Sequence, residues 1–102
     1  MKRYQLAFAP EARDDLNRPY DFLADIDLQR AERAIRVIES ALDAMQNHPH
    51  TCRKAVGGDM GSLWRELVIS FGSTGYVALF EITATDRVTV MAVRHQRESD
   101  YH

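Results

Sequence analysis

The spacing of apolar residues in the first half of the chain constrains the fold more than any other feature. They recur at steps of three and four residues, at Leu28, Ala31, Ile35, Ile38, Leu42 and Met45. This spacing places one apolar stripe along a helix, and Asp27 stands where the N-cap belongs. The pattern ends between Asn47 and Pro49. A second layer of structure must cover the stripe, because a helix with one apolar face buries it against another element.

The residues before this helix predict a strand followed by a second helix. Tyr4, Leu6 and Phe8 alternate with other residues, which is the period of a strand. Pro10 suits the first position of a helix over residues 10–24, because that position tolerates a missing N–H. Pro19 interrupts this helix and predicts a kink or a division near Arg18. The short connection near Asp25 makes the two helices antiparallel neighbours.

After Pro49 the period changes from helical to alternating. Three apolar segments follow, near residues 63–71, 76–82 and 88–94, joined by "GSTG" and "TATD". Such short connections predict an antiparallel meander. The predicted fold class is therefore α+β in one domain over residues 1–102: an N-terminal strand, an antiparallel helical hairpin, then a three-stranded meander. The helices would cover one face of the sheet and leave the other partly open.

The composition excludes several classes of protein. The one cysteine, Cys52, rules out a disulfide within the chain and predicts a reducing, cytoplasmic setting, with the thiol in a packing role. No apolar run approaches the roughly 18 residues that span a bilayer, so no membrane association is expected. The chain has no glycine-rich phosphate loop, and "HPH" at 48–50 predicts a turn better than a metal site. We therefore expect no cofactor and no metal.

Charge argues against a dedicated nucleic-acid-binding protein but permits a local basic patch. The net charge is −2, whereas nucleic-acid-binding domains are usually basic. The second half of the chain nevertheless places basic residues on the predicted strands or near their ends, namely Arg53, Lys54, Arg65, Arg94 and Arg97.

Arg65 has two interpretations. It falls in phase with Leu67 and Ile69, so its side chain should point toward the apolar face or the margin of that face. One interpretation pairs it with Glu81 on the adjacent strand. The other is a guanidinium held on a rigid strand to bind an anion, which suits phosphate.

The C-terminal "VRHQRESDYH" turns a predicted core strand into a run of polar groups. Arg94 continues the phase of Val90 and Ala92, so Arg65 and Arg94 are expected to share a surface with His95, Arg97 and Tyr101 around it. Cleavage of RNA from its own 2′-OH needs a base, an acid and a cation, and histidine, tyrosine and arginine supply these. The alternative is a polar tail that docks on the end of the strand.

Three segments resemble the RelE/ParE superfamily of toxins from bacterial type II toxin–antitoxin modules. They are "FAPEARDDLNRPYDFL", "WRELVISFGSTGYVALF" and "VMAVRHQRESDY", and the resemblance covers nearly the whole chain. It implies a helical hairpin on a sheet, as the periodicity predicts independently. It also implies a cognate antitoxin as partner and a toxin–antitoxin hetero-oligomer.

The resemblance leaves the target open between two classes. RelE-like members are ribosome-dependent mRNA endonucleases, and the candidate catalytic residues for that activity are Arg65, Arg94, His95 and Tyr101. ParE-like members inhibit DNA gyrase by contact. Arg53, Lys54 and Arg97 are candidate target-binding residues in either case. We favour the ParE-like interpretation, because the net charge of −2 suits ribosomal RNA poorly.

Overall fold

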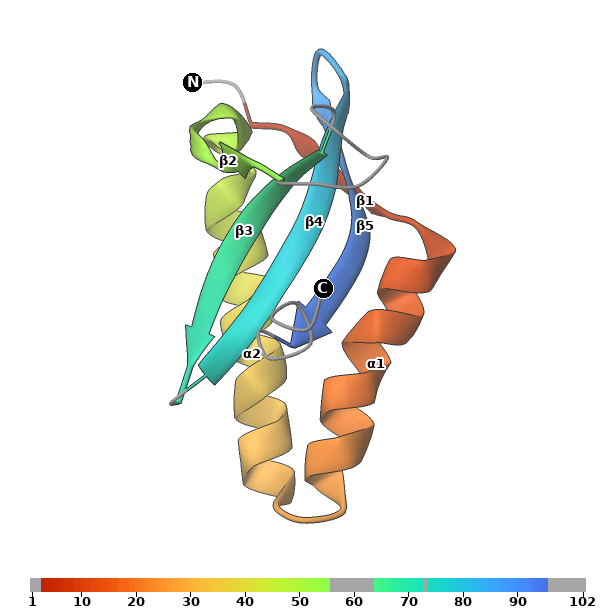
Figure 1. Ribbon diagram of the computed structural model, residues 1–102, viewed down its shortest axis with the longest axis vertical. Coiled ribbons are helices and arrows are strands. Elements are labelled where there is room, and N and C mark those ends of the chain that lie inside the picture. Colours follow the sequence, from red (N-terminus) through yellow and green to blue (C-terminus); the bar gives the residue numbers. More distant parts are fainter. Residues whose placement is uncertain (1–2, 56–63, 73, 96–102) are drawn as a thin grey trace.

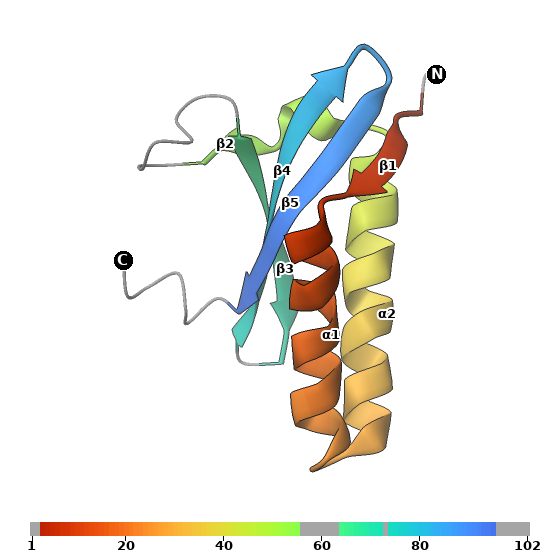
Figure 2. The ribbon, with the colours of Figure 1, turned by 90° about the vertical axis from the view of Figure 1, so that its right-hand side faces the viewer.

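The computed structural model, which describes residues 3–55, 64–72 and 74–95, shows two helices packed on one face of a five-stranded sheet (Figure 1). The elements follow the order β1 (Gln5–Phe8), α1 (Pro10–Ala24), α2 (Leu28–Met45), a 3-10 turn (Pro49–Thr51), β2 (Arg53–Lys54), β3 (Trp64–Phe71), β4 (Thr74–Ala84) and β5 (Arg87–His95). Both helices lie on the same side of the sheet when the molecule is turned (Figure 2). The predicted α+β class is confirmed.

The sheet contains the predicted meander and two additions to it. Strands β3, β4 and β5 pair antiparallel in sequence order, and the whole sheet has the order β1-β5-β4-β3-β2. Strand β1 pairs parallel with β5, with Phe8 opposite Val90. A parallel pair needs a long crossover, and here both helices lie within it. The short β2 adds to the outer edge of β3.

Both helices begin where the sequence predicts. Helix α1 starts at Pro10, and Asp27 caps α2 by accepting a hydrogen bond from the Arg30 N–H at 3.2 Å. The predicted division of α1 at Pro19 is wrong, because the helix continues to Ala24. One proline removes a single backbone hydrogen bond, and the helix continues past it. Neither described helix is long and apolar enough to cross a membrane.

The core lies between the helices and the sheet, and it follows most of the predicted stripe. Ile38 is fully buried, and the fully buried sheet residues beside it include Phe80, Val88 and Val90. The first residue of the stripe is not part of the core, because Leu28 is 52% exposed. The physical reason is visible in Figures 1 and 2: the helical hairpin extends past the end of the sheet, so the first turn of α2 has no strand beneath it.

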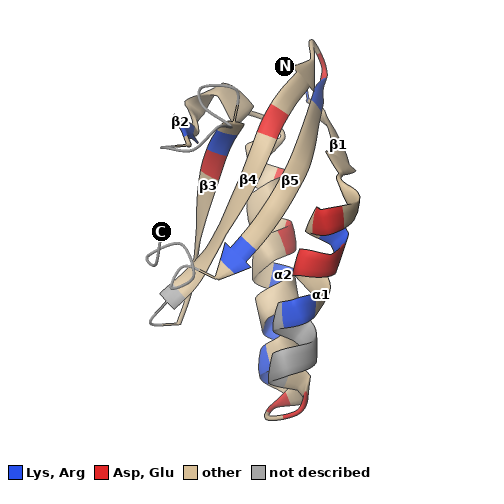
Figure 3. Ribbon diagram, turned by 45° about the vertical axis from the view of Figure 1, so that its right-hand side comes forward, with Lys and Arg blue, Asp and Glu red and all other residues tan. Residues whose placement is uncertain are grey.

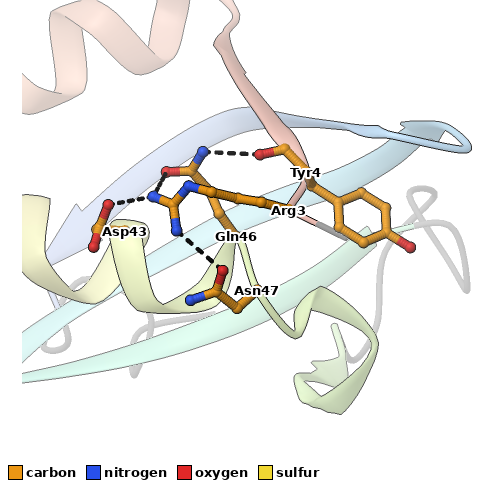
Figure 4. Close-up of polar contacts among 5 residues, drawn as sticks. All are labelled: Arg3, Tyr4, Asp43, Gln46 and Asn47. Carbon is orange, nitrogen blue, oxygen red and sulfur yellow. Dashed lines mark hydrogen bonds and ion pairs between the residues drawn. The ribbon is translucent and has the colours of Figure 1, made fainter. Parts of the chain in front are cut away.

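Hydrogen bonds fasten the start of β1 to the end of α2 (Figure 4). The backbone N–H of Tyr4 donates to the carbonyl of Gln46 at 3.0 Å, and the Gln46 side chain donates to the carbonyl of Tyr4 at 2.9 Å. The Arg3 guanidinium forms an ion pair with Asp43 and donates to Asn47. These contacts fix the position of Tyr4 relative to the segment that follows α2.

A carboxylate accepts a hydrogen bond from the backbone of β5 beyond the point where β1 ends. The Oδ2 atom of Asp15 on α1 accepts a hydrogen bond from the backbone N–H of Val93 at 2.9 Å. The other carboxylate oxygen of Asp15 pairs with Arg18. A partly buried N–H needs an acceptor, so Asp15 supplies the partner that β1 is too short to provide.

Replacing Asp15 with alanine should lower the free energy of unfolding by about 1–1.5 kcal/mol, because the Val93 N–H loses its acceptor. Urea unfolding measures the change. Asp14→Ala is the matched control, since Asp14 is exposed on the same helix and should change stability by less than about 0.5 kcal/mol. Equal effects of the two substitutions would contradict a specific role for the Asp15 contact.

Candidate functional site

Arg65 is half-buried, and one nitrogen of its guanidinium donates to backbone carbonyls. Its Nη1 atom donates to the carbonyl of Cys52 at 2.7 Å and to that of His50 at 3.4 Å. The expected pair with Glu81 is wrong, because Arg65 lies opposite Phe80 on β4. Neighbouring residues on a strand point to opposite faces, so Glu81 points away from Arg65. The guanidinium thus fastens the segment after α2 to the start of β3.

A tyrosine and a histidine complete this end of the site. The Nε2 atom of His50 lies 3.2 Å from the hydroxyl of Tyr4, and the two rings meet edge to face with centroids 6.0 Å apart. Tyr4 directly precedes β1, whereas His50 lies in the 3-10 turn, where "HPH" predicted a turn. The sequence analysis missed this pair, since Tyr4 was assigned only to a strand face.

Cys52 lies beside this cluster and is half-buried. Burial raises the pKa of its thiol above the ordinary value, and the nearby Arg65 charge opposes that shift only in part. A raised thiol pKa means less thiolate at neutral pH, and the thiolate is the reactive form. The packing role predicted for Cys52 therefore agrees with its surroundings.

Cys52 should react with iodoacetamide more slowly than free cysteine at pH 7.5, and its rate should rise with pH over a range displaced upward from that of free cysteine. The displacement follows from the raised pKa, because the thiolate fraction grows only as pH approaches it. Mass spectrometry of the native protein measures the rate. Denatured protein is the control, and identical rates before and after denaturation would contradict this assignment.

Arg94 and Arg65 lie on opposite faces of the sheet, so the expectation that they share a surface is wrong. The strand register shifts between Leu79 and Phe80, whose partners on β5 are Ala92 and Val90, so Met91 forms a bulge. An extra residue reverses which side chains face the core beyond it. Val93 therefore enters the core under the helices, while Ala92 and Arg94 point to the other face.

His95 lies on the helix side and packs in a second aromatic cluster. Its ring meets Tyr76 edge to face, with centroids 5.5 Å apart. The Tyr76 ring also packs against Phe71, with ring centroids 6.2 Å apart. The Arg30 guanidinium carbon lies 5.6 Å from the centroid of the Phe71 ring. Burial raises the pKa of Tyr76, and Arg30 opposes this shift. The alternation over residues 76–82 predicts a strand that contains Tyr76, but nothing in the sequence joins it to Arg30.

Some of the remaining candidate target-binding and catalytic residues lie in the described part of the chain, and others lie outside it. Arg53 is exposed and forms a cross-strand ion pair with Glu66, while Lys54 is exposed opposite Arg65. Arg97 and Tyr101 lie outside the described residues. Arg65 lies opposite Phe80 and His95 lies opposite Tyr76, four residues away along β4, so Arg65 lies beside neither His95 nor Arg94.

Charge changes along the helical hairpin (Figure 3). Helix α1 begins with acidic residues, including Glu11 and Asp14, whereas the first half of α2 carries Arg30, Arg33 and Arg36. Acidic residues suit the positive end of a helix dipole, so the start of α1 follows the favourable arrangement. The first turn of α2 contains no acidic residue and includes Arg30.

Two solved structures have a similar fold. A chain of the chromosomal ParDE TA system from P. aeruginosa matches with a TM-score of 0.74 and 15% identity, covering 91% of this chain and 96% of that one. A chain of the toxin–antitoxin complex RelBE2 from Mycobacterium tuberculosis matches with a TM-score of 0.60 and 20% identity, covering 93% of each. The chain therefore shares its architecture with these two proteins.

Sequence similarity then identifies the family. The family described as the ParE toxin of the type II toxin-antitoxin system, parDE, matches residues 6–100. Toxin RelE3 of Caulobacter vibrioides is 32% identical over 98 residues, which cover 96% of this chain and 98% of that protein. The chain belongs to the ParE toxin family of type II toxin–antitoxin systems.

Proposed function

We propose that this toxin inhibits growth by binding DNA gyrase and that it does not cleave RNA. The observation that carries the proposal is the separation of the two arginines expected to hold a phosphate. The Arg65 guanidinium donates to the carbonyls of His50 and Cys52, and Arg94 points to the opposite face.

The strand register separates the two arginines further. Arg65 lies in the row of Phe80, whereas Arg94 lies in the row of Val77, three residues away along β4. Three residues of strand span roughly 10 Å, and this offset adds to the separation of two side chains that point to opposite faces of the sheet. A net charge of −2 adds to the argument, since ribosome binding depends on neutralising phosphates.

The alternative is a RelE-like, ribosome-dependent mRNA endonuclease that uses Arg65, Arg94, His95 and Tyr101. The name of the C. vibrioides relative favours it, as does the pairing of a histidine with a tyrosine in the His95–Tyr76 contact. In that case His95 would transfer protons, and its loss would slow cleavage by about 10²–10⁴-fold.

Two assays with the purified protein separate these functions. Under our proposal the wild type inhibits supercoiling of relaxed plasmid by gyrase and leaves ribosome-bound mRNA intact. His95→Ala, checked for native unfolding behaviour, is compared in both assays. Cleavage of ribosome-bound mRNA by the wild type, lost in His95→Ala, would establish the nuclease and overturn our proposal.

We further propose that a cognate antitoxin binds the sheet face that the helices do not cover, forming a hetero-oligomer. A small apolar cluster lies on that face, where the side chains of Val77, Leu79 and Ala92 are buried and pack against the half-buried Trp64 and Ala55. An apolar centre with polar surroundings suits a partner segment that folds on binding.

Co-expression with the product of the adjacent open reading frame tests this partner. It should restore growth, and the two proteins should co-purify. Trp64→Glu should weaken the complex, because Trp64 is the half-buried large side chain of this cluster and the substitution places a charge at the proposed interface. Continued growth arrest with the two proteins eluting separately would contradict the assignment.

A further inference from the structure

Strand β5 has strand neighbours on both sides along its first half, but on one side along its second half. Strand β1 pairs with it from Arg87 to Val90, and the chain then enters α1 at Pro10. Residues 91–95 of β5 continue beyond this point, with β4 as their strand neighbour in the described sheet. A strand edge of this kind is a template on which another chain can pair.

Asp15 occupies a backbone donor at this edge. Val93 lies opposite Ala78 on β4, and its backbone N–H donates to the Asp15 carboxylate at 2.9 Å. Alternate residues of an antiparallel strand direct their N–H groups away from the neighbouring strand, so the Val93 N–H faces the side on which an added strand would lie. The Asp15 side chain is 14% exposed, and Arg18 pairs with its other oxygen. The carboxylate is therefore held where an added strand would need the Val93 donor.

A bulge marks the start of the same part of β5. The partners of Leu79 and Phe80 on β5 are Ala92 and Val90, which leaves Met91 as the extra residue. A bulge bends the strand and increases its local twist, which makes its edge a poorer template for a flat added strand. Natural sheets protect their edges with bulges and with charged side chains. Both features occur here within residues 91–93.

We propose that Asp15 blocks strand addition at this edge, and so prevents the protein from pairing through β5 with a second copy of itself. Two copies of one edge can pair antiparallel about a two-fold axis, because each copy supplies the donors and acceptors that the other needs. In such a pair the Val93 N–H would donate to the second copy in place of Asp15. The added strand would have to displace the carboxylate from its backbone donor, which is unfavourable. This inference does not depend on the target of the toxin.

Analytical ultracentrifugation of the purified protein tests the inference. Asp15→Ala removes the acceptor, whereas Asp15→Asn keeps an acceptor oxygen at the same position. Asp14→Ala is the matched control, because it removes one negative charge from an exposed position on the same helix. The loss of stability predicted above for Asp15→Ala is a small part of the stability of a typical domain, and thermal unfolding establishes that each variant folds. Asp15→Ala should self-associate at least about tenfold more tightly than the wild type, while the other two variants stay at the wild-type value.

Hydrogen exchange of the Val93 amide, followed by NMR, shows whether this edge forms the contact. In dilute Asp15→Ala the amide should exchange faster than in the wild type, because it has lost its acceptor. At concentrations where the variant self-associates, the exchange should become slow again, because the second copy supplies a new acceptor.

Three results would overturn the inference. A folded Asp15→Ala variant that associates no more than the wild type would show that Asp15 blocks nothing. Equal association of Asp14→Ala would assign the effect to lost surface charge. Association of Asp15→Ala that leaves the Val93 amide in fast exchange would place the contact between copies elsewhere on the molecule.

Discussion

Replacing Ile38 with alanine should lower the free energy of unfolding by about 2–5 kcal/mol. Ile38 is fully buried at the centre of the α2 stripe and belongs to the same core cluster as Phe80 and Val88. Removing its side-chain carbons loses the favourable free energy of burying them away from water. It also leaves a cavity between the helix and the sheet, which the surrounding residues fill only in part. The denaturant midpoint of the purified protein measures the loss.

Ile26→Ala provides the matched control for Ile38→Ala. The chemical change is the same, but Ile26 is 72% exposed at the hairpin tip. Its replacement should change the free energy of unfolding by no more than about 0.5 kcal/mol. If Ile38→Ala were equally mild, the helix stripe would not form the core, and the packing described here would be wrong.

Replacing Arg65 with alanine should destabilise the protein by about 1.5–3 kcal/mol, in addition to any effect on toxicity. The substitution removes charge-assisted hydrogen bonds to the carbonyls of Cys52 and His50, and so releases the segment after α2 from β3. Hydrogen exchange should increase in residues 49–55. Urea unfolding and exchange measured by mass spectrometry test the two effects.

The Arg65 prediction separates a structural arginine from a phosphate ligand. Arg53→Ala is the control, because Arg53 lies on the neighbouring strand and its exposed ion pair with Glu66 should contribute less than about 1 kcal/mol. A residue kept only to bind phosphate would leave stability unchanged or improved when it is replaced. Unchanged stability in a nontoxic Arg65→Ala variant would therefore favour the nuclease alternative.

Much of the architecture was determined by local patterns in the sequence. The 3-4 spacing specified α2, because only a helix gathers those positions on one face. Asp27 and Pro10 specified where the helices begin, because caps act on the backbone within three residues. The change to alternating apolar residues after Pro49 specified the meander, since short connections leave consecutive strands little choice of partner.

The candidate site depended on contacts that no local pattern contains. The bulge at Met91 reversed the phase of β5, so Arg94 and His95 exchanged the faces that alternation gave them. Alternation has a period of two, and one extra residue therefore moves every later side chain to the other face. Residues beyond a bulge can be assigned only when their cross-strand partners are known.

Partners far apart in sequence decided the rest. Arg65 donates hydrogen bonds to the carbonyls of His50 and Cys52. The pairing of β1 with β5 places Tyr4 beside His50. Leu28 kept the phase of a core residue yet stayed exposed, because the length of the hairpin exceeds the sheet that it covers. The spacing of apolar residues in the sequence shows which face of a helix is apolar. How much of that face becomes buried depends on where the other elements end, and only the tertiary structure sets that limit.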